Sequence, residues 1–106
     1  MNADQFEGYA EHYAAEARLI ILKALADQND YRLNDKMLTT VLQQFAINRG
    51  RDFTRNQLSW LEENASAVKL IRAGTAIVAE LTEAGLDHVE RRTVLHGVAR
   101  PSPARS

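Results

Sequence analysis

The sequence predicts an α+β domain that is mainly helical. Two helix-start patterns, at residues 53–58 and 81–86, flank an apolar stretch at residues 67–80, whose central Gly74 predicts a strand, a turn and a second strand. Apolar residues recur at helical spacing in two segments further upstream. The expected order is therefore helix, helix, helix, hairpin and helix. This is the order of a winged helix-turn-helix domain, with three helices, a β-hairpin wing and an additional C-terminal helix.

The first helix is expected over residues 9–27, and it carries two apolar stripes. The first stripe comprises Ala10, Tyr13, Ala14, Ala17, Ile20, Ile21, Ala24 and Leu25. The second stripe, roughly opposite, comprises Ala15, Leu19, Leu22 and Ala26. A helix that is apolar on two sides needs two partners, and the domain core supplies one. We predict that a second subunit covers the second stripe in a homodimer; the alternative is coverage by residues 93–100 of the same chain.

Turn and cap signals define the second helix. A turn at residues 28–30 and a very short strand at residues 31–33 precede Asn34, which is expected to cap the helix. Its apolar positions are Met37, Leu38, Val41, Leu42 and Phe45. Residues 48–50 supply a cationic last turn and a glycine stop, so the helix is expected to end there.

Local patterns also define the remaining elements. Thr54 is expected to cap the third helix while Gln57 reaches back to it. One face of the hairpin is expected to hold Val68, Leu70, Ile77 and Ala79. Thr82 is expected to start a fourth helix that runs to about Arg92. The resulting divisions are an N-terminal arm at residues 1–8, a domain at residues 9–100 and a disordered tail at residues 101–106.

Composition excludes several classes of function. The 106 residues carry a formal net charge of −1 and no cysteine, which excludes disulfides, zinc ribbons and thiolate metal sensors. His12, His88 and His96 lie on separate segments without paired ligand spacing, so no metal site is expected, and His88 is expected on a solvated helix face beside Asp87, Glu90 and Arg91. Ser59 and Thr54 have no activating base and no phosphate-binding glycine loop is present, so neither an enzyme nor a cofactor is predicted. No apolar run approaches the ~20 residues of a membrane span, and a cytoplasmic location is expected.

Polar residues around the third helix indicate a contact with double-stranded DNA. The candidate DNA-binding residues are Arg49, Arg51, Arg55, Asn56, Ser59, Lys69 and Arg72. Their side chains supply the donors that phosphates and base edges require. Glu62 and Glu63 in the same helix oppose phosphate binding, so the alternative is a solvated face of mixed charge. Trp60 could face the groove, although packing beside the core, against the first helix or the hairpin, is favoured.

Four segments carry a resemblance to a known family. They are residues 31–34, 58–62, 81–85 and 97–101, with the sequences YRLN, LSWLE, LTEAG and GVARP. In this register the chain resembles the small winged-helix proteins of Mu-like phages and prophages, over about residues 9–103. Those proteins are often labelled as similar to ArsR-type regulators. The resemblance implies a phage context and a winged-helix architecture; metal sensing is not carried over, because this chain lacks the cysteine pairs of ArsR-type sensors.

Two functional classes follow from these patterns. The first is a dimeric protein that binds double-stranded DNA, either as a transcriptional regulator or as an accessory in DNA packaging. The second is a winged-helix module that binds a phage protein during assembly and does not touch DNA. The salt dependence of binding separates the two classes, because phosphate contacts release counterions and apolar contacts do not.

Overall fold

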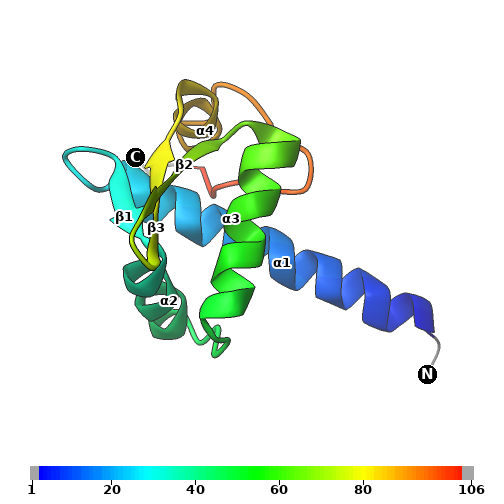
Figure 1. Ribbon diagram of the computed structural model, residues 1–106. Helices are drawn as coiled ribbons and strands as arrows, with labels where there is room; N and C mark the ends of the chain where they lie inside the picture. Colours follow the sequence, from blue (N-terminus) through cyan, green and yellow to red (C-terminus); the bar gives the residue numbers. More distant parts are fainter. Residues whose placement is uncertain (1–2, 104–106) are drawn as a thin grey trace.

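A computed structural model of the chain describes residues 3–103, with the surroundings of side chains described from residue 8. The elements in chain order are α1 (Ala3–Ala26), β1 (Arg32–Asn34), α2 (Asp35–Gln44), α3 (Arg51–Ala65), β2 (Val68–Ala73), β3 (Ala76–Leu81) and α4 (Glu83–Val89) (Figure 1). The α+β class and the predicted order of helices and hairpin are confirmed. Within residues 3–103, no helix is long and apolar enough to cross a membrane.

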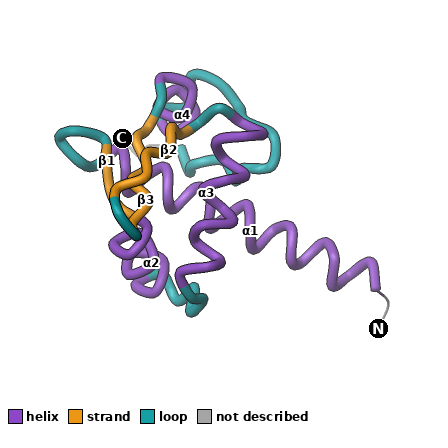
Figure 2. Tube along the Cα trace, viewed as in Figure 1, coloured by secondary structure: helices purple, strands orange, loops and turns teal. Residues whose placement is uncertain are grey.

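The three strands form one antiparallel sheet in the order β1-β3-β2 (Figure 2). Leu70 lies opposite Ala79, and Arg72 lies opposite Ile77. Residues directly opposite share a face, and side chains alternate along each strand. Val68, Leu70, Ile77 and Ala79 therefore lie on one face, as predicted. A two-residue turn closes the hairpin, and its first residue, Gly74, has a φ of +64°, which tight hairpin turns require.

Leucines from three helices meet the inner face of the sheet in a single core. The largest fully buried apolar side chains are Ile21, Leu22 and Leu25 from α1, Leu38 and Leu42 from α2, and Leu58 and Leu61 from α3. Val68, Ala79 and Leu81 cover them from the sheet. The core explains the helical spacing of the apolar residues. Met37 and Phe45, also expected on the apolar face of α2, are instead exposed.

The second apolar stripe of α1 is covered within the chain, so the predicted homodimer interface there is wrong. Leu22 is fully buried and Leu19 is 6% exposed, and both belong to the same core. Ala26 packs against that core, and the carbonyl oxygen of Ala15 accepts a hydrogen bond from the N–H of Ala99 (3.1 Å). The C-terminal segment therefore supplies part of the cover, as in the intrachain alternative.

His88 holds the C-terminal segment against α4. Its side chain is buried, Nδ1 accepts a hydrogen bond from the N–H of Leu95 (3.0 Å), and Nε2 lies 2.9 Å from the carbonyl oxygen of Ala99. The sequence indicated a solvated helix face at this position, and that interpretation is wrong for His88. Residues 101–103 have no regular secondary structure, and the rest of the predicted disordered tail lies outside the described residues, as do residues 1 and 2 of the predicted arm.

Two helix boundaries differ from prediction. Helix α1 begins at Ala3, six residues earlier than expected, and therefore includes most of the predicted arm. Helix α2 ends at Gln44 rather than near Gly50, because the N–H groups of Ala46 and Ile47 bond back to the carbonyls of Gln43 and Leu42. Ala46 adopts a φ of +65° in this Schellman-type ending.

The cap predicted at Thr54 is wrong, whereas those at Asn34 and Thr82 are confirmed. Helix α3 begins at Arg51 after Gly50, so Thr54 lies inside the helix. Its side chain is buried, and its hydroxyl oxygen lies 2.7 Å from that of Thr39. The side chain of Asn34 accepts the N–H of Met37 (2.8 Å), and the hydroxyl of Thr82 accepts the N–H of Gly85 (3.2 Å).

Candidate nucleic-acid interface

One face of α3 is open to solvent along its whole length. Asp52, Asn56, Ser59 and Glu63 are exposed and follow one another at helical spacing; we call them the α3 stripe. Thr54, Leu58 and Leu61 face the core on the other side. The polar residues of the stripe are thus presented to solvent because the apolar residues fix the rotation of the helix. This confirms the exposure expected for Asn56 and Ser59.

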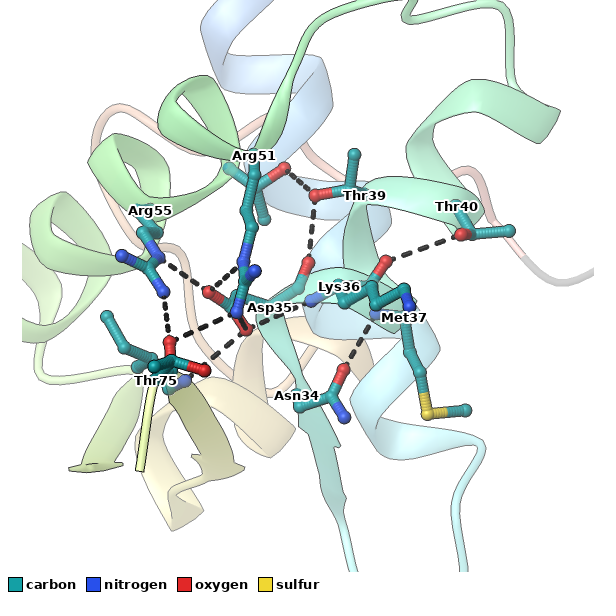
Figure 3. Close-up of polar contacts among 11 residues, drawn as sticks. Asn34, Asp35, Lys36, Met37, Thr39, Thr40, Arg51, Arg55 and Thr75 are labelled. Carbon is teal, nitrogen blue, oxygen red and sulfur yellow. Dashed lines mark hydrogen bonds and ion pairs between the residues drawn. The ribbon is translucent and has the colours of Figure 1, made fainter. Parts of the chain in front are cut away.

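A buried carboxylate lies at the start of α3. Asp35, the first residue of α2, is fully buried, and its oxygens accept hydrogen bonds from Arg51 Nε (2.8 Å) and Arg55 Nε (2.6 Å) (Figure 3). Backbone N–H groups of Lys36 (3.0 Å) and Ile77 (3.3 Å) donate to the same carboxylate. Burial alone would raise the pKa of Asp35. The hydrogen bonds from the two arginines and from Ile77 outweigh burial and hold this pKa well below its ordinary value.

The same two arginines reach the hairpin turn. Arg51 Nη2 and Arg55 Nη2 donate to the carbonyl oxygen of Thr75, at 3.1 and 2.6 Å (Figure 3). We call Asp35, Arg51, Arg55 and the Thr75 carbonyl the Asp35 cluster. It joins the start of α2, the start of α3 and the hairpin turn, and its two cations and one anion leave a net positive charge. Among residues 8–103, whose side chains are described, no partner occupies either Nη1 group, so both arginines keep donors for a ligand.

The other predicted cations lie on different surfaces. Arg72 is exposed and lies near the hairpin turn. It is on the same face of the sheet as Leu70, which is the face that packs toward the core. Lys69 lies across from Glu80, so its side chain is on the opposite face of the hairpin from that of Arg72. Arg49 precedes α3 and stacks on Phe53, with Cζ 4.5 Å from the ring centroid. Arg49 therefore lies beside Tyr13 of α1 and Phe53 of α3.

Sequence comparison identifies one phage relative. The chain is 36% identical over 89 residues to gp26, an uncharacterized protein of Escherichia phage Mu; the match covers 83% of this chain and 90% of gp26. The chain belongs to the gp26 family of phage Mu. The phage context implied by the resemblance is therefore confirmed. No known protein-family profile matches the chain.

Sequence reasoning missed two structural roles in this member of the gp26 family. Asp35 was visible only as an acid in the first turn of α2, and no local pattern connects it with residues 51, 55 and 75. Glu62, expected to oppose DNA, accepts the N–H of Leu70 (2.8 Å) on the outer edge of β2. An edge strand has unpaired N–H groups, and Glu62 satisfies one of them. Its charge is therefore already engaged by the protein itself.

Trp60 packs beside the core against the first helix, as favoured from the sequence. The guanidinium carbon of Arg18 lies 3.7 Å from the centroid of the Trp60 ring. Arg18 itself is buried and donates to Gln57 Oε1 (2.9 Å) and to the carbonyl oxygen of Gly97 (2.8 Å). Trp60 thus joins α3 to α1 and the C-terminal segment. The described residues contain no group of three or more potential metal ligands.

Proposed function

We propose that this protein is a winged-helix protein that binds double-stranded DNA, with α3 in the major groove and the β2–β3 turn beside the adjacent phosphates. The observation that supports this best is the Asp35 cluster. By joining the hairpin turn to the first turn of α3, it makes one continuous surface out of two elements that a DNA duplex would contact together. Preformed surfaces of this kind lose little conformational entropy on binding.

The chain path supports the winged-helix assignment. Strand β1 lies between α1 and α2 in sequence and pairs with β3, while β2 follows α3 and runs back along it. The hairpin turn is therefore at the same end of the domain as the start of α3 (Figure 1). A winged helix needs this arrangement, because its recognition helix and its wing contact neighbouring parts of one duplex.

Each exposed group has a role that suits its chemistry. Asn56 and Ser59, in the middle of the α3 stripe, offer the amide and hydroxyl groups that read base edges. Arg72 and the Nη1 groups of Arg51 and Arg55 would bind phosphates. Gly50 provides no side-chain cap, so the first N–H groups of α3 are also open to an anion.

Acidic residues set an upper limit on the expected affinity. Asp52 and Glu63 occupy the two ends of the α3 stripe, and the chain as a whole carries a charge of −1. Each carboxylate near a phosphate reduces the favourable electrostatic contribution that dominates DNA affinity. Binding should therefore be modest and should depend strongly on salt.

The test is a titration of fluorescently labelled duplex DNA, followed by anisotropy, at two salt concentrations. We expect binding that weakens with salt, and Arg72→Ala should weaken it for all sequences and reduce the salt slope by about one unit. Lys69→Ala is the matched control, because it removes the same charge from the same strand on the opposite face. Absence of binding at low salt with micromolar protein, or an equal effect of both substitutions, would contradict the proposed surface.

The role within a phage follows from sequence preference. Selection of binding sites from a random duplex pool should yield a motif if the protein is a transcriptional regulator, and the motif should change in an Asn56→Ala variant. An accessory protein of DNA packaging would bind with little preference. Both outcomes are compatible with DNA binding, and they distinguish its two uses.

A second candidate function is a protein-binding module, and one observation favours it. A groove of about 390 Å³ lies between the C-terminal parts of α1 and α2, lined by Ile20, Ala24, Val41 and Phe45 among others. Phe45 is 62% exposed at the rim of this groove. A groove that combines apolar lining residues with an exposed aromatic one suits a partner protein more than DNA. If DNA does not bind, this groove becomes the leading candidate interface.

A further inference from the structure

Two arginines that follow α4, Arg91 and Arg100, have no partner among the side chains described for residues 8–103. Other arginines of the chain are engaged. Carboxylates pair with Arg18, Arg32, Arg51, Arg55 and Arg92, and the ring of Phe53 stacks with Arg49. The guanidinium groups of Arg91 and Arg100 take part in no such contact, so all their N–H donors remain open to a ligand.

The C-terminal segment brings both arginines to one cavity. This cavity has a volume of about 110 Å³ and is lined by His88, Arg91, Thr93, Val94, Arg100 and Pro101. Its volume equals that of roughly four water molecules, at ~30 Å³ each in the liquid. The cavity is therefore on the scale of one compact ionic group.

Backbone hydrogen bonds fix the two positions from which the arginines reach the cavity. Nε2 of the buried His88 lies 2.9 Å from the carbonyl oxygen of Ala99, which directly precedes Arg100. The N–H of Arg91 donates to the carbonyl oxygen of His88 (3.1 Å). An incoming ligand would therefore order two side chains but not the backbone, which keeps the entropic cost of binding low.

The charge of the cavity is positive and unbalanced. None of the described residues that line it is acidic, and the sequence contains no acid after Glu90. The nearest acids in the sequence, Asp87 and Glu90, are both paired with Arg92, at 2.7 and 3.2 Å. Two cations that line one small cavity repel each other, and an anion between them would relieve this repulsion.

The backbone of Arg91 gives a further reason to assign a role to its side chain. Arg91 has a φ of +65° at the end of α4, where glycine is the usual residue. A side chain at positive φ is strained, and Arg91 is exposed, so packing within the chain does not compensate for the strain. Strained residues of this kind occur preferentially at ligand sites.

We propose that this cavity binds one phosphate group, carried either by inorganic phosphate or by a phosphomonoester. A phosphate group has a charge of about −1.5 to −2 at neutral pH, which matches two arginines better than a singly charged carboxylate does. Each guanidinium can donate two parallel hydrogen bonds to phosphate oxygens, and the hydroxyl of Thr93 adds another donor.

The phosphate site is separate from the proposed DNA surface. Strand β3 begins at the hairpin turn and ends where α4 starts, so the two surfaces lie at opposite ends of this strand (Figure 1). The inference therefore does not depend on DNA binding.

Titration of the ¹⁵N-labelled protein with inorganic phosphate, at an ionic strength held constant with chloride, tests the proposal. Amide and arginine Nε–H signals at residues 91 and 100 should shift and saturate, and Arg100→Ala should weaken binding by about tenfold. Arg32→Ala is the matched control, because it removes an arginine that already has a partner, Glu80, and it should leave binding unchanged. Absence of saturating shifts at these residues, or an equal effect of both substitutions, would overturn the proposal.

Arg91→Gly separates phosphate binding from stability. Glycine adopts a φ of +65° without strain, so the variant should unfold at the same or a higher denaturant concentration. Phosphate binding should nevertheless fall by about tenfold, because one of the two guanidinium groups is lost. Unchanged phosphate binding in a folded Arg91→Gly protein would contradict the proposed site.

Thymidine and thymidine 5′-monophosphate identify the source of the phosphate group. Tighter binding of the monophosphate than of inorganic phosphate would assign the site to a phosphomonoester, and the reverse order would assign it to the free anion. Equal binding of thymidine and its monophosphate at residues 91 and 100 would show that the cavity does not recognise phosphate.

Discussion

At the scale of single residues, Asp35 determines how the candidate DNA surface is organised. A buried charge is costly unless it is paired and hydrogen-bonded. Arg51 and Arg55 pair with the Asp35 carboxylate. They also donate hydrogen bonds to the carbonyl oxygen of Thr75, and these bonds hold the hairpin turn against α3. Asp35 itself is not expected to contact DNA, but it positions Arg51 and Arg55, which we propose contact phosphates. For this reason Asp35 acts as a positioning residue.

Replacing Asp35 with asparagine should destabilise the protein in a way that depends on pH. The cost near neutral pH should be about 1.5–3 kcal/mol, the usual range for hydrogen bonds to charged groups. Because the pKa of Asp35 is lower in the folded than in the unfolded chain, its contribution is complete above the unfolded value of about 4 and is lost as pH falls toward the folded value. Denaturant unfolding at several pH values should therefore show the two proteins converging in acid.

Asp52→Asn provides the control for this experiment. Asp52 is one residue from Arg51, but it is exposed in the first turn of α3, so its replacement should cost no more than the about 0.3–1 kcal/mol of a helix-dipole interaction. A constant difference between Asp35→Asn and the unmodified protein from neutral to acidic pH would show that the carboxylate is not held ionised by its arginines.

At the scale of elements, the sequence patterns correctly predicted the features that depend on contacts between residues close together in the chain. The caps at Asn34 and Thr82 and the shared face of the hairpin need only neighbouring residues, and all were predictable. The cap at Thr54 was not, because a capping pattern matches several starting points and the contacts of Arg51 with Asp35 favour the earlier one. The pattern left open whether a second subunit or residues 93–100 of the same chain cover the second stripe of α1, because periodicity in one helix does not show which distant segment packs against it.

The end of α2 offers a direct test at this scale. Ala46 has a positive φ, which costs an ordinary residue about 1–2 kcal/mol and costs glycine little. Ala46→Gly should therefore raise the free energy of unfolding, by up to about 1 kcal/mol. Chemical denaturation measures the change. The same exchange at Ala24, inside α1, should lower stability, and a loss of stability in Ala46→Gly as well would mean that α2 does not end in this conformation.

At the scale of the whole molecule, we propose that the α3 stripe and the Asp35 cluster together form one surface that binds DNA. The sequence identified Asn56, Ser59, Arg51, Arg55 and Arg72 as candidates, because donors near the start of a predicted helix and near a hairpin turn are recognisable locally. The sequence could not show that Lys69 and Arg49 face other directions than these candidates. Strand register determines the direction of Lys69, and the path of the loop before α3 determines that of Arg49.

Chemical-shift mapping of the isotopically labelled protein with duplex DNA tests the central claim most directly. We predict that backbone amide signals of residues 51–59 and 72–75 shift together as DNA is added, because the Asp35 cluster makes α3 and the hairpin turn one surface. Signals from α4 and from the groove near Phe45 should stay in place. Shifts confined to that groove, or to α3 without the hairpin turn, would contradict the claim that α3 and the turn bind DNA as a unit.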